Sequence, residues 1–468
     1  MLYRLLRLLA TVALRWYYRR VEVVGAERFP RAGPLMVAGN HPNALVDALV
    51  LARVAPRRLL LTAKATLFEH PLLAAVLRRA GVVPLRRAAD EAAKGAGPAL
   101  DPSRNARSFA AVQDALARGG AVLVFPEGRS HDEPALSPLR TGLARIALGA
   151  RDERGVRGLA VLPVGLTFEE KAAPRSRVLV QVGDPIALDA WRAAPDAGSE
   201  AEALTREVDA RLRAVTLNFE SAVAARRVLA LGRTLAAVLG EPRPLGDPHP
   251  PLARIAPLAR RIEAARRSVE AAAPSGGGPA AAAGATALRA VAFAERLERL
   301  EGLTEGRGVA LAEAMIPLSV GRGAWFVVRE LALAVAGGPL AVWGRLNHLL
   351  PFKLALRLGR RGARTQDEPA MRAIVAGLGL VLAFYAAQAA LVGALLGPLW
   401  AAAYVVTLPA SAGWDLRFSD RRDDAWRRVR AYRTLRRDPA LRAELEREIE
   451  ALRAEAAALD GLLPDASG

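Results

Sequence analysis

The chain has 468 residues, enough for two or three domains, and its 66 Lys and Arg against 47 Asp and Glu give a formal net charge of +19. Such a charge suits either nucleic acid or an anionic membrane surface as partner. Aromatic residues are only 5% of the chain, which leaves little for base stacking, so we expect no nucleic-acid partner. The absence of cysteine excludes disulfides, thiolate metal ligands and a cysteine nucleophile.

The first predicted element is an amphipathic helix over residues 1–20. Arg4, Arg7 and Arg15 recur at roughly helical spacing, and the longest uncharged run, Leu8–Leu14, is too short for a signal-peptide core or a membrane span. We interpret the segment as an interfacial helix that lies on a membrane. Its end then supplies headgroup-level anchors, namely Trp16, Tyr17, Tyr18, Arg19 and Arg20. The alternative is a helix packed against the domain that follows.

Residues 21–215 alternate short apolar runs with longer helical patterns. This alternation predicts an α/β domain whose sheet is covered by helices. The apolar runs predict strands at Leu35–Ala38, Leu59–Thr62, Ala121–Phe125, Ala160–Thr167 and Val178–Val182. The helical patterns between them include Pro71–Ala80, Ala106–Arg118 and Thr141–Gly149.

A helical region rich in arginine and alanine is expected at residues 216–310. It is interrupted first by the segment Pro242–Pro251. A second interruption is the low-complexity stretch Ala271–Ala287, which predicts a flexible linker or loop.

Residues 311–420 form an apolar region that contains the uncharged run Ala373–Trp414. One membrane span needs about 20 residues, so this run is close to two spans, and Gly397 and Pro398 near its middle permit a turn. We therefore expect a membrane hairpin at residues 373–414. The alternative is a buried hairpin of a soluble domain, although soluble helices usually show a polar face.

Both flanks of this run are basic, so the positive-inside rule places both at the cytoplasmic face. The cations are Lys353, Arg357, Arg360, Arg361, Arg364 and Arg372 before it, and Arg417, Arg421 and Arg422 after it. The earlier segment Ala324–Leu350 is apolar but contains Arg329, Glu330 and Arg345, and we expect it to be interfacial or re-entrant. The tail, residues 421–468, predicts a charged amphipathic helix or helical hairpin.

The strongest local motif is Gly39–Asp47 (GNHPNALVD), which follows a predicted strand and opens a helix. Positions six apart differ by roughly 240° around a helix axis, so His41 must lie on the turn and Asp47 about one turn into the helix. Asn43 is the expected N-cap. The Asp47 carboxylate can then reach back and fix the imidazole tautomer, while His41 deprotonates a substrate hydroxyl. Taken alone, such a pair is more simply explained as a structural contact.

Three further clusters lie in the same predicted domain. They are Gly81–Arg87 (GVVPLRR), Phe125–His131 (FPEGRSH) and Leu162–Gly165 (LPVG), and the second follows a hydrophobic strand at the end where open α/β sheets bind ligands. Nearby, Arg140–Gly142 opens a helix, where a cation and backbone N–H groups favour an anion. His131 is a weaker candidate for substrate contact. Each cluster has a simple structural explanation, but four motifs in order indicate a site.

These four motifs resemble the blocks of the glycerolipid acyltransferases of the lysophospholipid acyltransferase superfamily, over about residues 20–215. Members include glycerol-3-phosphate and 1-acylglycerol-3-phosphate acyltransferases. The resemblance implies that His41 is the catalytic base and Asp47 its partner. It also implies contacts of Arg87 with the acceptor phosphate, of Glu127 and Gly128 with the acceptor, and of Pro163 with a pocket. The full predicted substrate-binding set is Asn40, Arg87, Glu127, Gly128, Arg129, Ser130, Arg140 and Pro163.

The chain departs from the usual blocks at two points. The commonest first block has four residues between His and Asp, whereas here there are five, Pro42–Val46. The third block is usually Glu-Gly-Thr-Arg, whereas here it is Glu127-Gly128-Arg129-Ser130. The distance from His41 to Asp47 is therefore the first one to check.

The sequence thus predicts an O-acyltransferase that moves a fatty acyl group from a thioester, on coenzyme A or acyl carrier protein, to glycerol-3-phosphate or 1-acylglycerol-3-phosphate. We expect no cofactor and no metal, since no His, Asp and Glu cluster has ligand spacing. Expected partners are membrane lipids and the donor, at the cytoplasmic face of a membrane such as a bacterial inner membrane. The alternatives are a lysophospholipid transacylase or other lipid O-acyltransferase, and a non-catalytic protein that binds anionic lipid. Oligomeric state stays open.

Overall fold

The computed structural model describes residues 2–85, 102–196, 198–240, 250–272, 280–304, 306–307, 309, 313, 319–361, 363, 365 and 367–460. The chain divides into two compact units. One unit contains residues 1–218 and 354–378, and the other contains residues 219–353 and 379–468. The domain boundaries expected from the sequence stay predictions.

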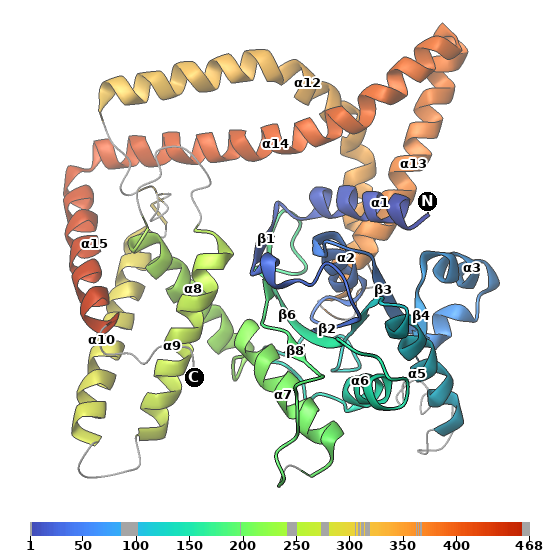
Figure 1. Ribbon diagram of the computed structural model, residues 1–468. Helices are drawn as coiled ribbons and strands as arrows, with labels where there is room; N and C mark the ends of the chain where they lie inside the picture. The colour runs from blue at the N-terminus through green and yellow to red at the C-terminus, as the bar shows by residue number, and fades with distance from the viewer. Residues whose placement is uncertain are drawn as a thin grey trace. The chain divides into compact units, whose positions relative to one another are not determined.

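The first unit is built on one eight-stranded sheet (Figure 1). Its strands run in the order β1-β7-β6-β2-β5-β3-β4, with β8 paired to β6. Strands β7 and β8 lie antiparallel to β6, and the other pairs are parallel. The bounds are β1 Arg20–Val24, β2 Leu35–Gly39, β3 Leu59–Lys64, β4 Val83–Leu85, β5 Ala121–Val124, β6 Ala160–Phe168, β7 Arg177–Val182 and β8 Ile186–Ala187. The five predicted strands are confirmed as β2, β3, β5, β6 and β7, whereas the sequence analysis did not predict strands at β1, β4 and β8.

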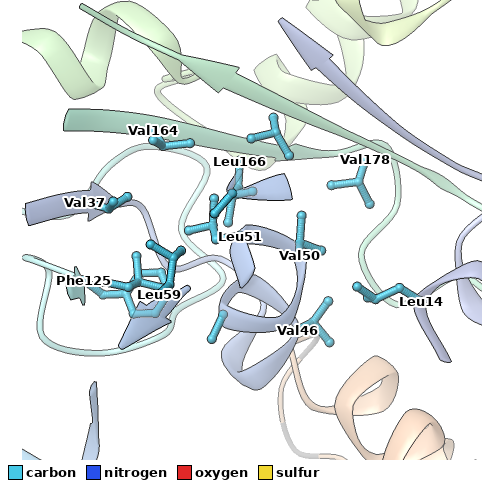
Figure 2. Close-up of a cluster of buried hydrophobic side chains, with 14 of the residues drawn as sticks. Leu14, Val37, Val46, Val50, Leu51, Leu59, Phe125, Val164, Leu166 and Val178 are labelled. Carbon is cyan, nitrogen blue, oxygen red and sulfur yellow. The ribbon is translucent and has the colours of Figure 1, made fainter. Parts of the chain in front are cut away.

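Helices cover both faces of this sheet, which confirms the α/β class. Alternate residues of β2 point to opposite faces, so Leu35 and Val37 join one hydrophobic cluster and Met36 and Ala38 join the other. Figure 2 shows the first cluster, which includes residues of α1 and α2. The second cluster includes residues of α5, α6 and α7. The bounds are α1 Leu2–Tyr17, α2 Ala44–Val54, α3 Pro71–Ala80, α5 Pro102–Ala117, α6 Gly142–Asp152 and α7 Glu200–Val215, with short 3-10 helices at Ala26–Arg28 and Ala65–Phe68.

Helix α1 packs against the sheet domain. Tyr17 and Tyr18 are only 2% and 1% exposed, and the Tyr17 hydroxyl donates to the carbonyl of Ala172 at 2.8 Å. The prediction that these two tyrosines are headgroup anchors was therefore wrong, because tertiary packing buries both rings. The opposite side of α1 still exposes apolar side chains, namely Leu5, Leu8 and Val12. An interfacial role for that side stays a prediction.

The second unit contains helices that pack around a core of their own. They are α8 (Ala222–Val238), α9 (Leu252–Ala272), α10 (Ala280–Thr304) and α15 (Pro439–Asp460), joined by the end of α14. The predicted linker Ala271–Ala287 was too long, because α9 extends to Ala272 and α10 begins at Ala280. Alanine has the highest helix propensity, so the Ala-rich part of that stretch is helical. The rest of it, residues 273–279, lies outside the described residues, as does most of Pro242–Pro251.

Three long helices follow: α12 (Val320–Arg360), α13 (Glu368–Leu396) and α14 (Pro398–Arg437). The predicted turn is confirmed, since Gly397 separates α13 from α14 with φ 94° and Pro398 opens α14. Among the described helices, α12 and α13 are long and apolar enough to cross a membrane. The predicted hairpin therefore has one of its two arms, α13, among these candidates, whereas the second arm, in α14, is not among them.

The segment Ala324–Leu350 is part of one continuous helix, which contradicts a re-entrant chain, whereas an interfacial position stays a prediction. We did not expect a span here, yet the helix that contains the segment, α12, is long and apolar enough to cross a membrane. Its charges have partners on α14, because Arg345 pairs with Asp415 at 3.0 Å and Glu330 with Arg421 at 2.8 Å. The tail is helical over its described residues, as predicted, because α14 continues past Trp414 to Arg437 and α15 follows it.

Candidate active site

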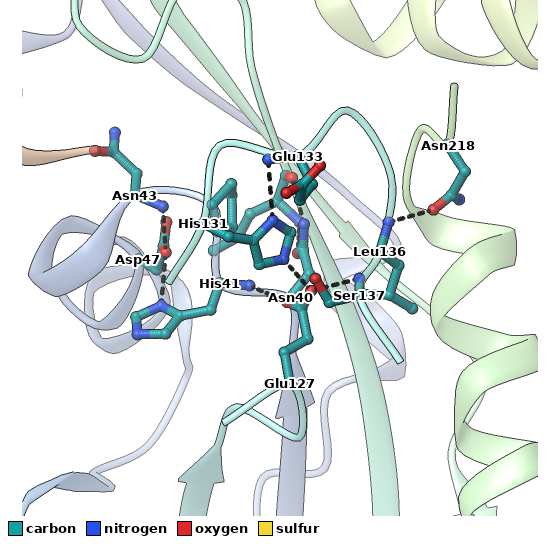
Figure 3. Close-up of polar contacts among 12 residues, drawn as sticks. Asn40, His41, Asn43, Asp47, Glu127, His131, Glu133, Leu136, Ser137 and Asn218 are labelled. Atoms are coloured by element: carbon teal, nitrogen blue, oxygen red, sulfur yellow. Dashed lines mark hydrogen bonds and ion pairs between the residues drawn. The ribbon is translucent and has the colours of Figure 1, made fainter. Parts of the chain in front are cut away.

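The motif residues gather at the carboxyl ends of two neighbouring parallel strands, β2 and β5. Leu35 to Ala38 pair in register with Ala121 to Val124, so the turns that follow both strands lie side by side. His41 lies on the first turn and Glu127 on the second, as the sequence predicted. Figure 3 shows the two turns and the contacts between them.

The side chains of His41 and Asp47 are in hydrogen-bond contact. The imidazole Nδ1 lies 2.9 Å from Oδ2 of Asp47, so the five intervening residues do not prevent the pair. The turn between them contains Ala44 in the left-handed region at φ 47°, a conformation uncommon for residues other than glycine. Ala44 precedes Asp47 by less than one helical turn, so its conformation helps to set the path of the five-residue connection from His41 to Asp47.

Asn43 precedes α2 as predicted, but its side chain does not cap the helix. Its amide group instead donates to the hydroxyl of Tyr18 at 2.8 Å. The backbone N–H of Asn43 donates to Oδ2 of Asp47 at 2.7 Å. The same oxygen therefore has hydrogen bonds with both the backbone of the turn and the His41 imidazole. Asn43 thus occupies the N-cap position, as predicted, but the capping hydrogen bond is missing: its side-chain oxygen accepts no hydrogen bond from the described residues, while its NH2 group donates to Tyr18.

Asp47 is fully buried, and burial raises its pKa, opposed by its hydrogen bond with His41, by the charge of His41, by the backbone N–H of Asn43 and by the charge of Lys171. An ionised Asp47 accepts from Nδ1–H of His41, which leaves Nε2 as the basic nitrogen. Within the described part of the chain, no hydrogen bond engages Nε2. The His41 ring also stacks on Phe125, with centroids 4.0 Å apart and planes 6° apart. The imidazole is therefore held on one face and at one nitrogen.

Glu127 uses its carboxylate to hold protein backbone. Its Oε1 accepts from the backbone N–H of His41 at 2.7 Å, and its Oε2 accepts from the backbone N–H of Ser137 at 2.8 Å. The same Oε2 also contacts Nε2 of His131. Only 4% of Glu127 is exposed, so this carboxylate acts as a buried link between the two turns.

His131 has both ring nitrogens engaged. Nδ1 accepts from the backbone N–H of Glu133 at 3.2 Å, which leaves Nε2 as the nitrogen that donates to Glu127. This arrangement fits a neutral imidazole with its proton on Nε2. It leaves no ring nitrogen for a substrate in the present geometry.

Asn40 directly follows β2 and is partly buried, and Pro163 is buried within β6. The amide of Asn40 donates to the carbonyl of Leu166 at 3.0 Å, and its oxygen accepts from the backbone N–H of Leu166 at 2.7 Å. Asn40 therefore pairs with β6 as a backbone group would. Pro163 is buried in β6 opposite Ala38, and its ring lies beside Gly183.

Two arginines near the third motif are exposed, Arg129 and Arg140. Within the residues described, neither guanidinium pairs with a carboxylate. Gly128 has φ 77°, and a Cβ there would lie 3.6 Å from Cγ of Arg140, so the Arg140 side chain passes over this turn. Arg87 lies outside the described residues, so its predicted contact is untested.

Lys171, in the connection between β6 and β7, was not singled out by the sequence. Its ammonium donates to the carbonyls of Pro42 at 3.1 Å and His131 at 3.3 Å, and it pairs with Asp132 at 2.6 Å. It thus joins the first and third motifs from a third segment. A lone lysine in a loop has no local pattern that could have identified it.

The acyltransferase family matches residues 20–167. An uncharacterized acyltransferase of Schizosaccharomyces pombe is 24% identical over 255 residues, 38% of this chain and 38% of that protein. Glycerol-3-phosphate O-acyltransferase 2 of Saccharomyces cerevisiae is 41% identical over 85 residues, 18% of this chain and 11% of that protein. 1-acyl-sn-glycerol-3-phosphate acyltransferase alpha of Mus musculus is 30% identical over 148 residues, 32% of this chain and 48% of that protein.

The chain thus spans less than half the length of each of these curated relatives. Among solved structures, that of the 1-acyl-sn-glycerophosphate (LPA) acyltransferase PlsC from Thermotoga maritima is 21% identical, with a TM-score of 0.34. The match covers 46% of this chain and 78% of that one.

Proposed function

We propose that this protein transfers a fatty acyl group from a thioester to glycerol-3-phosphate or 1-acylglycerol-3-phosphate. The match of residues 20–167 to the acyltransferase family supports this proposal. The reaction would serve phospholipid synthesis. The observation that carries the proposal is the 2.9 Å contact between Nδ1 of His41 and Asp47, with Nε2 left unengaged within the described residues.

In the proposed reaction, Nε2 of His41 takes the proton of the acceptor hydroxyl as its oxygen attacks the thioester carbonyl. A C–O bond forms, and the tetrahedral intermediate then collapses with cleavage of the C–S bond. The imidazolium returns its proton to the departing thiolate, so no enzyme nucleophile and no cofactor are required. Asp47 stabilises the imidazolium while it exists, as the aspartate of a catalytic triad does.

The acceptor phosphate would bind to arginines near the third motif. Arg129 and Arg140 are exposed and form no ion pair with described carboxylates, and guanidinium groups bind phosphate through paired hydrogen bonds. Arg87 is a further candidate through the family resemblance. Such contacts position the acceptor hydroxyl beside His41, and positioning lowers the barrier by several kcal/mol.

We also propose that the protein acts at a membrane, with the catalytic domain at the cytoplasmic face. Two apolar helices, α12 and α13, support membrane association. The connection between them contains Arg361 and Arg364, which favours the cytoplasmic side for this connection under the positive-inside rule. The acyl donor, on coenzyme A or acyl carrier protein, would arrive from solution while the product stays in lipid.

The experiment that tests this proposal is acyl transfer in isolated membranes with a radiolabelled thioester, comparing glycerol-3-phosphate with 1-acylglycerol-3-phosphate. We expect labelled product with one or both acceptors and loss of activity in His41→Ala. His70→Ala is the matched control, because His70 is exposed and distant from the motifs in sequence. Unchanged activity in His41→Ala would contradict the mechanism.

The same assay distinguishes the alternatives. Equal rates with acceptors that lack a phosphate would favour a lysophospholipid transacylase or another lipid O-acyltransferase. No transfer to any acceptor, with retained biological function in a His41→Ala/Asp47→Ala double variant, would favour a non-catalytic protein that binds anionic lipid.

A further inference from the structure

Lys171, in the connection between β6 and β7, brings a third segment of the chain to the two turns of the candidate active site. Its ammonium donates to the carbonyl of Pro42 at 3.1 Å and to the carbonyl of His131 at 3.3 Å, and it pairs with Asp132 at 2.6 Å. An ammonium group has three N–H donors, and these acceptors use all of them. In this geometry Lys171 therefore acts on a substrate only through the turns that it holds.

The backbone of Lys171 is itself held in place. Its carbonyl accepts from the hydroxyl of Tyr18 at 3.3 Å and from the amide of Asn43 at 3.5 Å. The next carbonyl, that of Ala172, accepts from the hydroxyl of Tyr17 at 2.8 Å. Both tyrosines are buried, and only 16% of the Lys171 side chain is exposed. The ammonium therefore reaches the two turns from a fixed backbone.

The turn that begins at His41 depends on hydrogen bonds from distant segments. The backbone N–H of His41 donates to Glu127 at 2.7 Å, and its carbonyl accepts from the backbone N–H of His131 at 3.3 Å. Pro42 has no backbone N–H, so its carbonyl is its one main-chain hydrogen-bonding group. This carbonyl accepts from Lys171, which lies 129 residues further along the chain. Lys171 thus fixes the residue that directly follows His41.

The position of this turn sets the position of the proposed base. Nε2 of His41 must come within about 2.6–3.2 Å of the acceptor oxygen to take its proton. A displacement of about 1 Å in such a site can cost about a hundredfold in rate. Removal of the ammonium takes one hydrogen bond from each turn, at Pro42 and at His131, and so frees the turns to shift relative to each other.

We propose that Lys171 is a positioning residue for acyl transfer: its ammonium holds the carbonyls of Pro42 and His131 and so keeps Nε2 of His41 where it meets the acceptor hydroxyl. This inference rests on the proposed function. It also gives the connection between β6 and β7, which lies beyond the family match at residues 20–167, a part in the active site.

The test compares three variants of the full-length protein in membranes or detergent: Lys171→Met, Lys171→Arg and Asp132→Asn. Methionine is also unbranched but has neither charge nor N–H donors, whereas arginine has both. Asp132→Asn removes the ion pair and leaves the two carbonyl acceptors in place. Glu170→Gln is the matched control, because Glu170 is the exposed neighbour in the same connection.

Steady-state kinetics separate kcat from the two KM values, at a temperature at which thermal unfolding shows every variant to be folded. We expect Lys171→Met to lower kcat by about tenfold to a hundredfold, with both KM values changed less than about threefold, because the substrate contacts remain. Lys171→Arg should retain most of the activity. Asp132→Asn should lose less than about threefold, because a partly exposed ion pair contributes little. Glu170→Gln should match the wild type.

Hydrogen exchange followed by mass spectrometry gives a reading that does not depend on turnover. The backbone N–H groups of His41 and Asn43 donate to Glu127 and Asp47. If Lys171 holds this turn, Lys171→Met should speed exchange in the peptide that contains His41 and Asn43 by about tenfold, the effect of losing a hydrogen bond to a charged group. Exchange in α6 should stay at the wild-type rate, whereas a global loss of stability would speed it as well.

An unchanged kcat in Lys171→Met would overturn the inference, as would faster exchange in α6 to the same extent. An equal loss of kcat in Lys171→Met and Asp132→Asn would also overturn it, because the ion pair would then be the cause. Failure of the proposed function looks different, since the wild type would transfer no acyl group to either phosphate acceptor. Hydrogen exchange then decides whether Lys171 positions His41. Faster exchange at His41 in Lys171→Met but not in Glu170→Gln supports this positioning, and wild-type exchange in both overturns it.

Discussion

The backbone N–H of His41 donates a 2.7 Å hydrogen bond to Oε1 of Glu127, across a separation of 86 residues. The other carboxylate oxygen accepts from Ser137 and contacts His131. The family resemblance assigns Glu127 to the acceptor, whereas in this geometry its oxygens are engaged by the protein. The hydrogen bond from Glu127 therefore helps to fix the position of His41.

Glu127→Gln should therefore lower both stability and activity. An amide has only one oxygen, so one of the two buried backbone N–H groups would face an NH2 group and lose its acceptor. The expected loss of stability is about 1–3 kcal/mol, the cost of an unsatisfied buried donor. Thermal unfolding and acyl transfer measure the two effects. Glu133→Gln is the control, because Glu133 is exposed. Full activity with unchanged stability in Glu127→Gln would contradict this role.

Asp47→Asn should separate stability from activity. The pKa of Asp47 is raised in the folded protein, so the folded state binds more protons than the unfolded state above the ordinary value of 3.8. The contribution of Asp47 to the free energy of unfolding therefore falls as pH rises from 3.8 to its raised pKa in the folded protein. The contribution stays reduced at higher pH.

The neutral amide introduced by Asp47→Asn avoids this cost, so we expect the variant to be at least as stable as the wild type at neutral pH. The advantage should vanish below pH 3.8, where Asp47 is protonated in both states. Acyl transfer should fall by orders of magnitude because the imidazolium loses its charged partner. Melting temperatures of both proteins across pH are the measurement, and lower stability of Asp47→Asn at neutral pH would show that the charge stabilises the fold.

Asn40→Asp should destabilise the join between β2 and β6. The replaced NH2 group donates to the carbonyl of Leu166 at 3.0 Å, and a carboxylate oxygen there would face that carbonyl without a proton between them. We expect a loss of about 1–3 kcal/mol in unfolding free energy. Chemical denaturation is the measurement, and unchanged stability of Asn40→Asp would argue against a special role for Asn40.

Gly344→Val should weaken the packing of α12 on α14. A Cβ at Gly344 would overlap the carbonyl oxygen of Ser411, whereas a Cβ at Gly338 of the same helix meets nothing within 4 Å. Small residues of this kind let apolar helices approach closely. Thermal stability in detergent should fall for Gly344→Val and stay near the wild-type value for Gly338→Val. Similar stability of the two variants would contradict the close approach.

Local sequence determined the elements that depend on local chemistry. Alternation of apolar runs with helical patterns placed the five main strands, because a covered parallel sheet requires continuous apolar strands between helices. Gly397 and Pro398 placed the turn after α13, because glycine tolerates positive φ and proline opens a helix. The motif residues were predicted at the ends of strands, where open α/β sheets bind ligands. Local composition also misled, since the Ala-rich half of the predicted linker is helix.

Tertiary structure alone decided which groups meet. Tyr17 and Tyr18 gave the pattern of interfacial anchors, yet both are buried because the domain packs against α1. Glu127 binds the backbone of His41, and Lys171 donates to the carbonyls of Pro42 and His131, although nothing in either local sequence names the partner. Spacing along the chain fixes periodicity and turns, whereas a side chain's partner depends on how distant segments pack. The contact between His41 and Asp47 was therefore readable from their motif, whereas the contacts of Glu127 and Phe125 with His41 were not.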